Sequence, residues 1–116
     1  ILAVQPVEVS PVYHALMNKP YMPPEELTTV ADALISTKPI RLQEMVEVLR
    51  ETGGSAEIVE DQEILKSHKQ LAAEGLYVEP SSAASHAAYL KWVISGQIKQ
   101  GEDAVILLTG SGLKIA

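Results

Sequence analysis

The sequence predicts a single α/β domain of three layers (α/β/α), in which helices cover both faces of a mainly parallel sheet. Short unbroken apolar runs, typical of strands that are covered on both faces, alternate with segments in which apolar residues recur at helical spacing. The 116 residues are 47% hydrophobic and 21% charged, far from the composition of a disordered chain. This length allows one hydrophobic core, so we expect residues 1–116 to form one domain.

Four apolar runs are the candidate strands of this sheet. The first covers residues 1–4 and is stopped by Pro6 and Pro11, and the others cover residues 30–35, 56–59 and 104–108. Residues 13–29 are less regular, because Pro20, Pro23 and Pro24 mark turns there, although residues 24–27 could open one helical turn.

Three helices are predicted between these runs. In the first, apolar residues stand at i, i+3, i+4 and i+7, and Gly53-Gly54 ends the helix; they are Leu42, Met45, Val46 and Leu49. The second begins at Asp61, which occupies the position of an N-cap, and stops at Gly75. The third runs from Ser81 or Ser82 to Ser95, between Pro80 and Gly96.

Composition excludes several classes of function. The 15 acidic residues outnumber nine scattered basic residues, which argues against a nucleic-acid surface. The absence of cysteine excludes disulfides and thiolate chemistry. No apolar stretch approaches the ~18 residues of a membrane span, and the chain opens directly on an apolar run without an initiator methionine. We therefore expect a cytoplasmic piece of a longer protein.

The histidines and most carboxylates give no sign of a metal site or of a catalytic role. No two of His14, His68 and His86 have the spacing that presents two imidazoles to a metal, so we expect no metal site. His68 should be a packed, hydrogen-bonded core residue and His86 a half-exposed packing residue. Asp32 interrupts an apolar run and should lie in a turn. The carboxylates opposite the apolar stripe of the first helix should face solvent; they are Glu44, Glu47 and Glu51.

Two segments are candidates for a binding site. In residues 79–85, hydroxyls crowd a helix start that small residues follow, which suits either an anion or close packing of the helix on its sheet. In residues 107–114, a predicted strand ends at Thr109 and continues into a Gly-x-Gly turn. Ligands bind outside the carboxyl ends of strands in open α/β sheets, so the Thr109 hydroxyl would point into that crevice. A lone Gly-x-Gly is nevertheless a weak motif.

These two segments, residues 74–84 (E-G-L-Y-V-E-P-S-S-A-A) and residues 101–114 (G-E-D-A-V-I-L-L-T-G-S-G-L-K), resemble the C-terminal part of the threonine synthase family. That family belongs to the tryptophan-synthase-like, fold type II group of pyridoxal-phosphate enzymes. Upstream, residues 29–34 are similar to its T-x-A-D-G-I segment and residues 4–6 to its V-E-P strand. The resemblance covers about the whole chain.

The resemblance implies a cofactor pocket at the strand ends. The hydroxyl at the position of Thr109 would bond the pyridine nitrogen of pyridoxal phosphate, and the turn at Gly110 would pass close to the ring. Glu79 and Ser82 would line or support the pocket. The implied reaction eliminates phosphate from O-phosphohomoserine and adds water to give threonine. The expected partners are an amino-acid-type substrate, the missing N-terminal half of the same enzyme, and further copies of the chain in a homo-oligomer.

The resemblance also shows what these residues do not supply. The Schiff-base lysine and the glycine-rich phosphate loop belong to the preceding half of the family's domain, and no lysine of this chain has a matching context. We therefore expect no catalytic residue here and no activity from the chain alone. Ala33 and Gln5 depart from the family's glycine and glutamate. The alternatives are another fold type II enzyme, such as a cysteate synthase or a serine/threonine dehydratase, and a non-catalytic α/β binding module.

Overall fold

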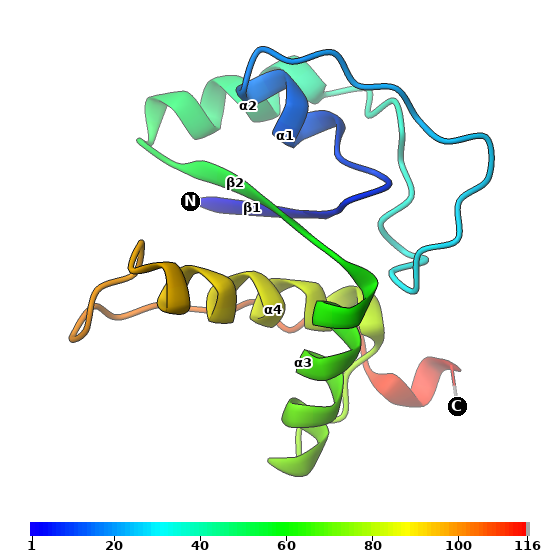
Figure 1. Ribbon diagram of the computed structural model, residues 1–116, viewed down its shortest axis with the longest axis vertical. Helices are drawn as coiled ribbons and strands as arrows, with labels where there is room; N and C mark the ends of the chain where they lie inside the picture. Colours follow the sequence, from blue (N-terminus) through cyan, green and yellow to red (C-terminus); the bar gives the residue numbers. More distant parts are fainter. Residues whose placement is uncertain (116) are drawn as a thin grey trace.

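The computed structural model describes residues 1–115 and has three layers (Figure 1). A two-stranded sheet lies between one pair of helices, α1 and α2, and the helix α4, against which α3 packs. In chain order the elements are β1 (Leu2–Pro6), α1 (Pro11–Leu16), α2 (Leu42–Glu51), β2 (Ser55–Val59), α3 (Asp61–Ala73), α4 (Pro80–Ser95) and the 3-10 helix η1 (Gly112–Ile115). The predicted α/β class with a parallel sheet is confirmed.

The sheet consists of β1 and β2 in parallel, with Leu2 opposite Ser55 and Pro6 opposite Val59. Both strands were predicted from apolar runs. The strand β2 begins next to the chain start because Gly54 leaves room there: a Cβ at this position would overlap the carbonyl group of Ile1. The glycine therefore both ends the preceding helical segment and permits the pairing of β1 with β2.

Two predicted strands are absent from the described residues, and so is the helical turn predicted at residues 24–27. Residues 104–108 follow an irregular path along α4, and Val105 is 93% and Leu107 74% exposed. A strand is stabilised by the ladder to its neighbour, and the described residues place no strand beside this segment. In residues 30–35 a turn forms instead, in which the Leu34 amide donates to the Ala31 carbonyl oxygen over 2.9 Å.

The helix α1 was not predicted, because Pro11 was interpreted as a stop of the preceding apolar run. Pro11 stands at its first position, where the missing amide costs no hydrogen bond and the fixed φ suits a helix. The N-cap of α3 was also assigned one residue too late. Its N-cap is Glu60, which forms a capping box with Glu63, and the Asp61 side chain is thereby left for another role.

The core lies where α3 and α4 meet β2. The small residues of α4 let the helix approach closely, and Ala83, Ala84, Ala87 and Ala88 are buried with Val59, Ile64 and Leu71. Gly96 ends α4 in the left-handed conformation, with φ at +79°. The predicted role of the small residues in close packing is confirmed, as is the predicted end of the helix.

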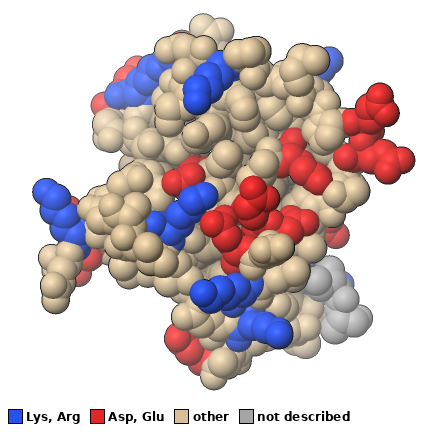
Figure 2. All heavy atoms as spheres, viewed as in Figure 1, with Lys and Arg blue, Asp and Glu red and all other residues tan. Residues whose placement is uncertain are grey.

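Charged side chains also tie α4 to its neighbours. Lys91 Nζ donates to the Ile58 carbonyl oxygen over 2.9 Å and lies 3.7 Å from carboxylate oxygens of both Glu57 and Glu63. Trp92 Nε1 donates to Glu57 over 2.9 Å. On the face drawn in Figure 2, acidic side chains gather near the middle while basic side chains are scattered. Among the described residues, no helix has the length and apolar character that would cross a membrane.

Candidate functional site

The four predicted site residues meet at the N-terminus of α4. Glu79 is the N-cap of this helix, and Ser82 lies in its first turn. The chain returns to the same point at Thr109 and Gly110. The Thr109 amide donates to Ser82 Oγ over 2.9 Å, and the Glu79 amide donates to the Gly110 carbonyl oxygen over 3.0 Å. The two segments that were singled out from the sequence therefore form one structural unit.

The Gly-x-Gly turn packs against the residues that lead into α4. A Cβ on Gly110 would overlap the Glu79 carboxylate, and a Cβ on Gly112 would lie 2.6 Å from the Tyr77 ring. An antiparallel bridge between Val78 and Ser111 holds the two segments together. The close approach expected at these glycines is thus made to groups of the chain itself.

Glu79 is a buried carboxylate, with only 8% of the residue exposed. Lys114 Nζ lies 3.9 Å from Glu79 Oε1, and the Lys114 side chain is 65% exposed. The N-terminal end of a helix attracts negative charge, which favours a carboxylate at this position. The Glu79 side chain therefore fills the space beside Gly110, and its charge is paired with Lys114.

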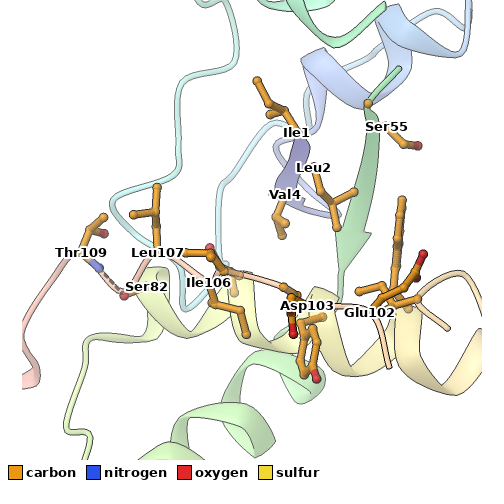
Figure 3. A pocket seen from close by; sticks show the side chains of 18 of the residues that line it. Ile1, Leu2, Val4, Ser55, Ser82, Glu102, Asp103, Ile106, Leu107 and Thr109 are labelled. Carbon is orange, nitrogen blue, oxygen red and sulfur yellow. Dashed lines mark hydrogen bonds between the residues drawn. The ribbon is translucent and has the colours of Figure 1, made fainter. Parts of the chain in front are cut away.

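A large open cavity of about 980 Å³ lies between β1, one side of α4 from Ser81 to Trp92, and residues 102–107 (Figure 3). Such a volume is at the upper end of the range for small-molecule sites. Ser81, Ser82 and Thr109 supply hydroxyls to its lining, and apolar side chains such as Leu2 and Leu34 form much of the wall. Of the four predicted residues, Ser82 and Thr109 therefore line the cavity, whereas Glu79 and Gly110 lie behind them.

The histidines lie away from this cavity. His86 is half-buried, as predicted, with Nδ1 2.7 Å from Ser67 Oγ, and burial lowers the pKa of its imidazole. His68 packs against the Tyr77 ring, but its buried Nε2 has no hydrogen-bond partner within residues 1–115, so the predicted hydrogen-bonded core histidine is only half right. Within the same residues no cluster of His, Cys, Asp or Glu could hold a metal.

Other predicted side chains take their expected places. Asp32 is exposed and lies in a turn. The carboxylates of Glu44, Glu47 and Glu51 face solvent on α2. None of these four carboxylates lines the large cavity.

The side chains that attach residues 28–34 to the site were not predicted from the sequence. Asp61 and Glu8 accept hydrogen bonds from this segment, and Ser81 Oγ accepts one from the Ala33 amide over 3.0 Å. One signal was present, since Thr28-Thr29 precedes the predicted strand and threonine hydroxyls often bond nearby backbone groups. Their partners could not be identified, because they are 20 to 48 residues away in the chain.

Comparison with known proteins gives a consistent result. The family model for pyridoxal-phosphate dependent enzymes matches residues 1–110. The threonine synthase of Bacillus sp. (strain ULM1) is 43% identical over 91 residues, which cover 78% of this chain and 26% of that protein. The threonine synthase of Methanosarcina acetivorans is 44% identical over 93 residues, which cover 79% of this chain and 23% of that protein.

A solved structure shares the fold. The crystal structure of a threonine deaminase from T.th. matches with a TM-score of 0.64 and 23% sequence identity, over 80% of this chain and 34% of that chain. The chain spans about a quarter of the length of the curated relatives that it matches. With the family model matching nearly the whole sequence, the chain belongs to the pyridoxal-phosphate dependent enzyme family.

Proposed function

We propose that this chain forms the side of a pyridoxal-phosphate pocket that faces the pyridine nitrogen, in an enzyme of the threonine synthase type. One observation carries the proposal: Thr109, held by its amide on Ser82 Oγ, lines the cavity beside the hydroxyls of α4. The identity of 43–44% to two threonine synthases supports the choice of enzyme type.

The residues at this end of the cavity suit a pyridine ring. Thr109, Ser81 and Ser82 offer neutral hydroxyls, and the pyridine nitrogen is a hydrogen-bond acceptor that a hydroxyl can meet. When bound, the cofactor supplies an electron sink for elimination and replacement at the β or γ carbon of an amino acid. A hydroxyl, unlike a carboxylate, does not hold a proton on the ring nitrogen, so Thr109 would keep that sink mild.

Each residue then has a distinct task. The Thr109 hydroxyl would donate to the ring nitrogen, and Ser82 orients Thr109 by accepting its amide hydrogen bond. Gly110 provides the space that the Glu79 carboxylate fills, and Lys114 balances the charge of that carboxylate. Glu79 and Gly110 therefore position the turn without contacting the cofactor themselves.

The covalent and phosphate-binding parts of the pocket would come from outside these residues. No lysine lines the cavity within the described part of the chain. Lys91 is engaged with Glu57 and Glu63, and Lys114 with Glu79. We propose that another part of the same enzyme supplies the Schiff-base lysine and the phosphate loop, and that the present chain alone is inactive.

For the whole enzyme we propose the conversion of O-phosphohomoserine to threonine and phosphate in the cytoplasm, by a homo-oligomer. The competing activities are those of a cysteate synthase or of a serine/threonine dehydratase, which would use the same hydroxyl and ring. A competing function without catalysis is a small-molecule-binding module. Assay of the complete enzyme with O-phosphohomoserine, phosphoserine, serine and threonine distinguishes these activities, and release of phosphate with formation of threonine is the expected result.

The coding sequence upstream of Ile1 tests the proposal most directly. A lysine at a strand-to-helix junction and a glycine-rich loop would support it, whereas a start codon immediately before Ile1 would overturn it. In the complete enzyme, Thr109→Val should weaken cofactor binding and Thr109→Ser should retain it. Titration of bound pyridoxal phosphate by its visible absorbance measures both, and equal affinity of Thr109→Val and the unmodified enzyme would refute the assigned role.

A further inference from the structure

The segment of residues 28–34 is held in place chiefly by side chains from distant elements. The Glu8 carboxylate accepts hydrogen bonds from the Thr28 amide over 2.8 Å, from the Thr28 hydroxyl over 2.6 Å and from the Thr29 amide over 3.0 Å. Hydrogen bonds to an ionised group are about twice as strong as neutral ones. One end of the segment is therefore fastened to the loop that follows β1.

A second carboxylate holds the middle of the segment. Asp61, at the start of α3, accepts the Thr29 hydroxyl over 2.7 Å and the Val30 amide over 3.2 Å. The same Thr29 oxygen accepts the Ala31 amide over 3.2 Å. The Thr29 hydroxyl thus links the Asp61 carboxylate to the amide of Ala31, which is fully buried in the core.

The far end of the segment reaches the proposed cofactor site. The Ala33 amide donates to Ser81 Oγ over 3.0 Å, and Ser81 lines the large cavity next to Ser82. The following residue, Leu34, lines the same cavity. A displacement of the segment would therefore move one wall of the cavity and release a hydroxyl at the N-terminus of α4.

We propose that Asp61 and Thr29 are positioning residues, which hold residues 28–34 as a wall of the cofactor cavity. The inference rests on the proposed function for the identity of the occupant, and on the hydrogen bonds above for the mechanism. Asp61 is free for this task because Glu60 and Glu63 cap α3. Asp61 and Thr29 do not line the cavity themselves, and act through Ala31, Ala33 and Leu34.

Hydrogen exchange measures how firmly Asp61 and Thr29 hold residues 28–34, an arrangement that we call the clamp. Thr29→Val removes the hydroxyl that joins Asp61 to Ala31, whereas Thr29→Ser keeps it, and Asp61→Asn weakens the acceptor. We expect the exchange rates of the Val30, Ala31 and Ala33 amides to rise about tenfold in Thr29→Val and Asp61→Asn, and to stay within about twofold in Thr29→Ser. The exposed carboxylate variant Glu51→Gln is the control and should change none of them.

The exchange rate of the Leu71 amide distinguishes loosening of residues 28–34 from loss of the whole fold, because Leu71 is a residue of α3 that is buried in the hydrophobic core. Unchanged protection at Leu71 with faster exchange at Val30 and Ala31 supports the clamp. Equal exchange of the Val30 and Ala31 amides in Thr29→Val and Thr29→Ser overturns it. If Asp61→Asn does not fold, the comparison of the two Thr29 variants still decides the question.

The dissociation constant for pyridoxal phosphate in the complete enzyme tests the link to the cavity. We expect it to rise about tenfold in Thr29→Val and to remain within about twofold in Thr29→Ser. A complete enzyme that binds pyridoxal phosphate equally well with either side chain overturns the positioning role alone. A complete enzyme that binds no pyridoxal phosphate with Thr29 intact overturns the proposed function as well.

Discussion

Substitution of Gly110 by alanine should destabilise the protein through one identified overlap. The added Cβ would collide with the Glu79 carboxylate and would lie 2.7 Å from Glu79 Cγ. Because Cγ is close to the backbone and the Glu79 amide is bonded to the Gly110 carbonyl, the side chain cannot swing aside freely. Overpacking of this kind costs about 1–3 kcal/mol of unfolding free energy.

A double-mutant cycle with Glu79→Ala tests this explanation, because alanine at position 79 lacks the atoms that would collide with the new Cβ. Gly110 has no positive φ, so its backbone conformation tolerates alanine. Replacing glycine at such a position stabilises a protein by about 0.4–1 kcal/mol through the unfolded state. We therefore expect Gly110→Ala to be neutral or slightly stabilising when Glu79 is alanine.

Urea denaturation of the four proteins in this cycle, followed by circular dichroism, gives the coupling energy between the two positions. We expect a coupling of at least ~1 kcal/mol, well above the error of additivity for independent sites. If Gly110→Ala costs the same whether residue 79 is glutamate or alanine, the collision is not the reason for glycine at this position. A need for close approach to another group would then have to explain it.

Two further predictions concern the packing of α4. Burial lowers the pKa of His86, and the charge of Glu74 partly opposes this shift, so the folded state binds fewer protons than the unfolded state. The unfolding free energy should therefore be highest above about pH 6.5, the ordinary pKa of histidine, and should decline as the pH falls below that value. His86→Gln should reduce this decline in urea titrations between pH 7.5 and 5. Trp92→Phe removes the hydrogen bond to the half-buried Glu57 and should lower the unfolding free energy by about 1–2 kcal/mol; no change in the urea midpoint would show that water replaces the indole.

The regular parts of the fold could be predicted because their signals are local. Helical spacing and Gly53-Gly54 located α2, and the glycine after Ser95 located the end of α4. The apolar runs at residues 1–4 and 56–59 became strands because each has the other as its neighbour. The run at residues 104–108 has the same character but no neighbour among the described residues, and a sequence pattern does not report its own pairing partner.

The site shows the same division between local and distant signals. The hydroxyl-rich helix start and the Gly-x-Gly turn were found by composition, and the family resemblance implied that Ser82 and Thr109 share one pocket. The strand that was expected to end at Thr109 does not form, and the hydrogen bond from the Thr109 amide to Ser82 joins the two segments instead. The hydrogen bonds at Thr29 were not predicted, because Asp61 also has an ordinary local explanation. Asp61 was interpreted as a helix cap, and only the capping box of Glu60 in the structure shows that the cap lies elsewhere.

The hydrogen bond between the Thr109 amide and Ser82 allows the effects of Thr109→Val and Ser82→Ala to be told apart. Its bond to Ser82 uses the backbone amide, so Thr109→Val leaves that bond in place and removes only the hydroxyl. Ser82→Ala has the opposite effect, because it keeps the Thr109 hydroxyl and removes the acceptor that orients it. If the hydroxyl itself meets the cofactor, Thr109→Val should weaken cofactor binding at unchanged stability, whereas Ser82→Ala should also loosen residues 109–112. The proposed role of Thr109 therefore depends on a loss of affinity that occurs without a loss of order in this turn.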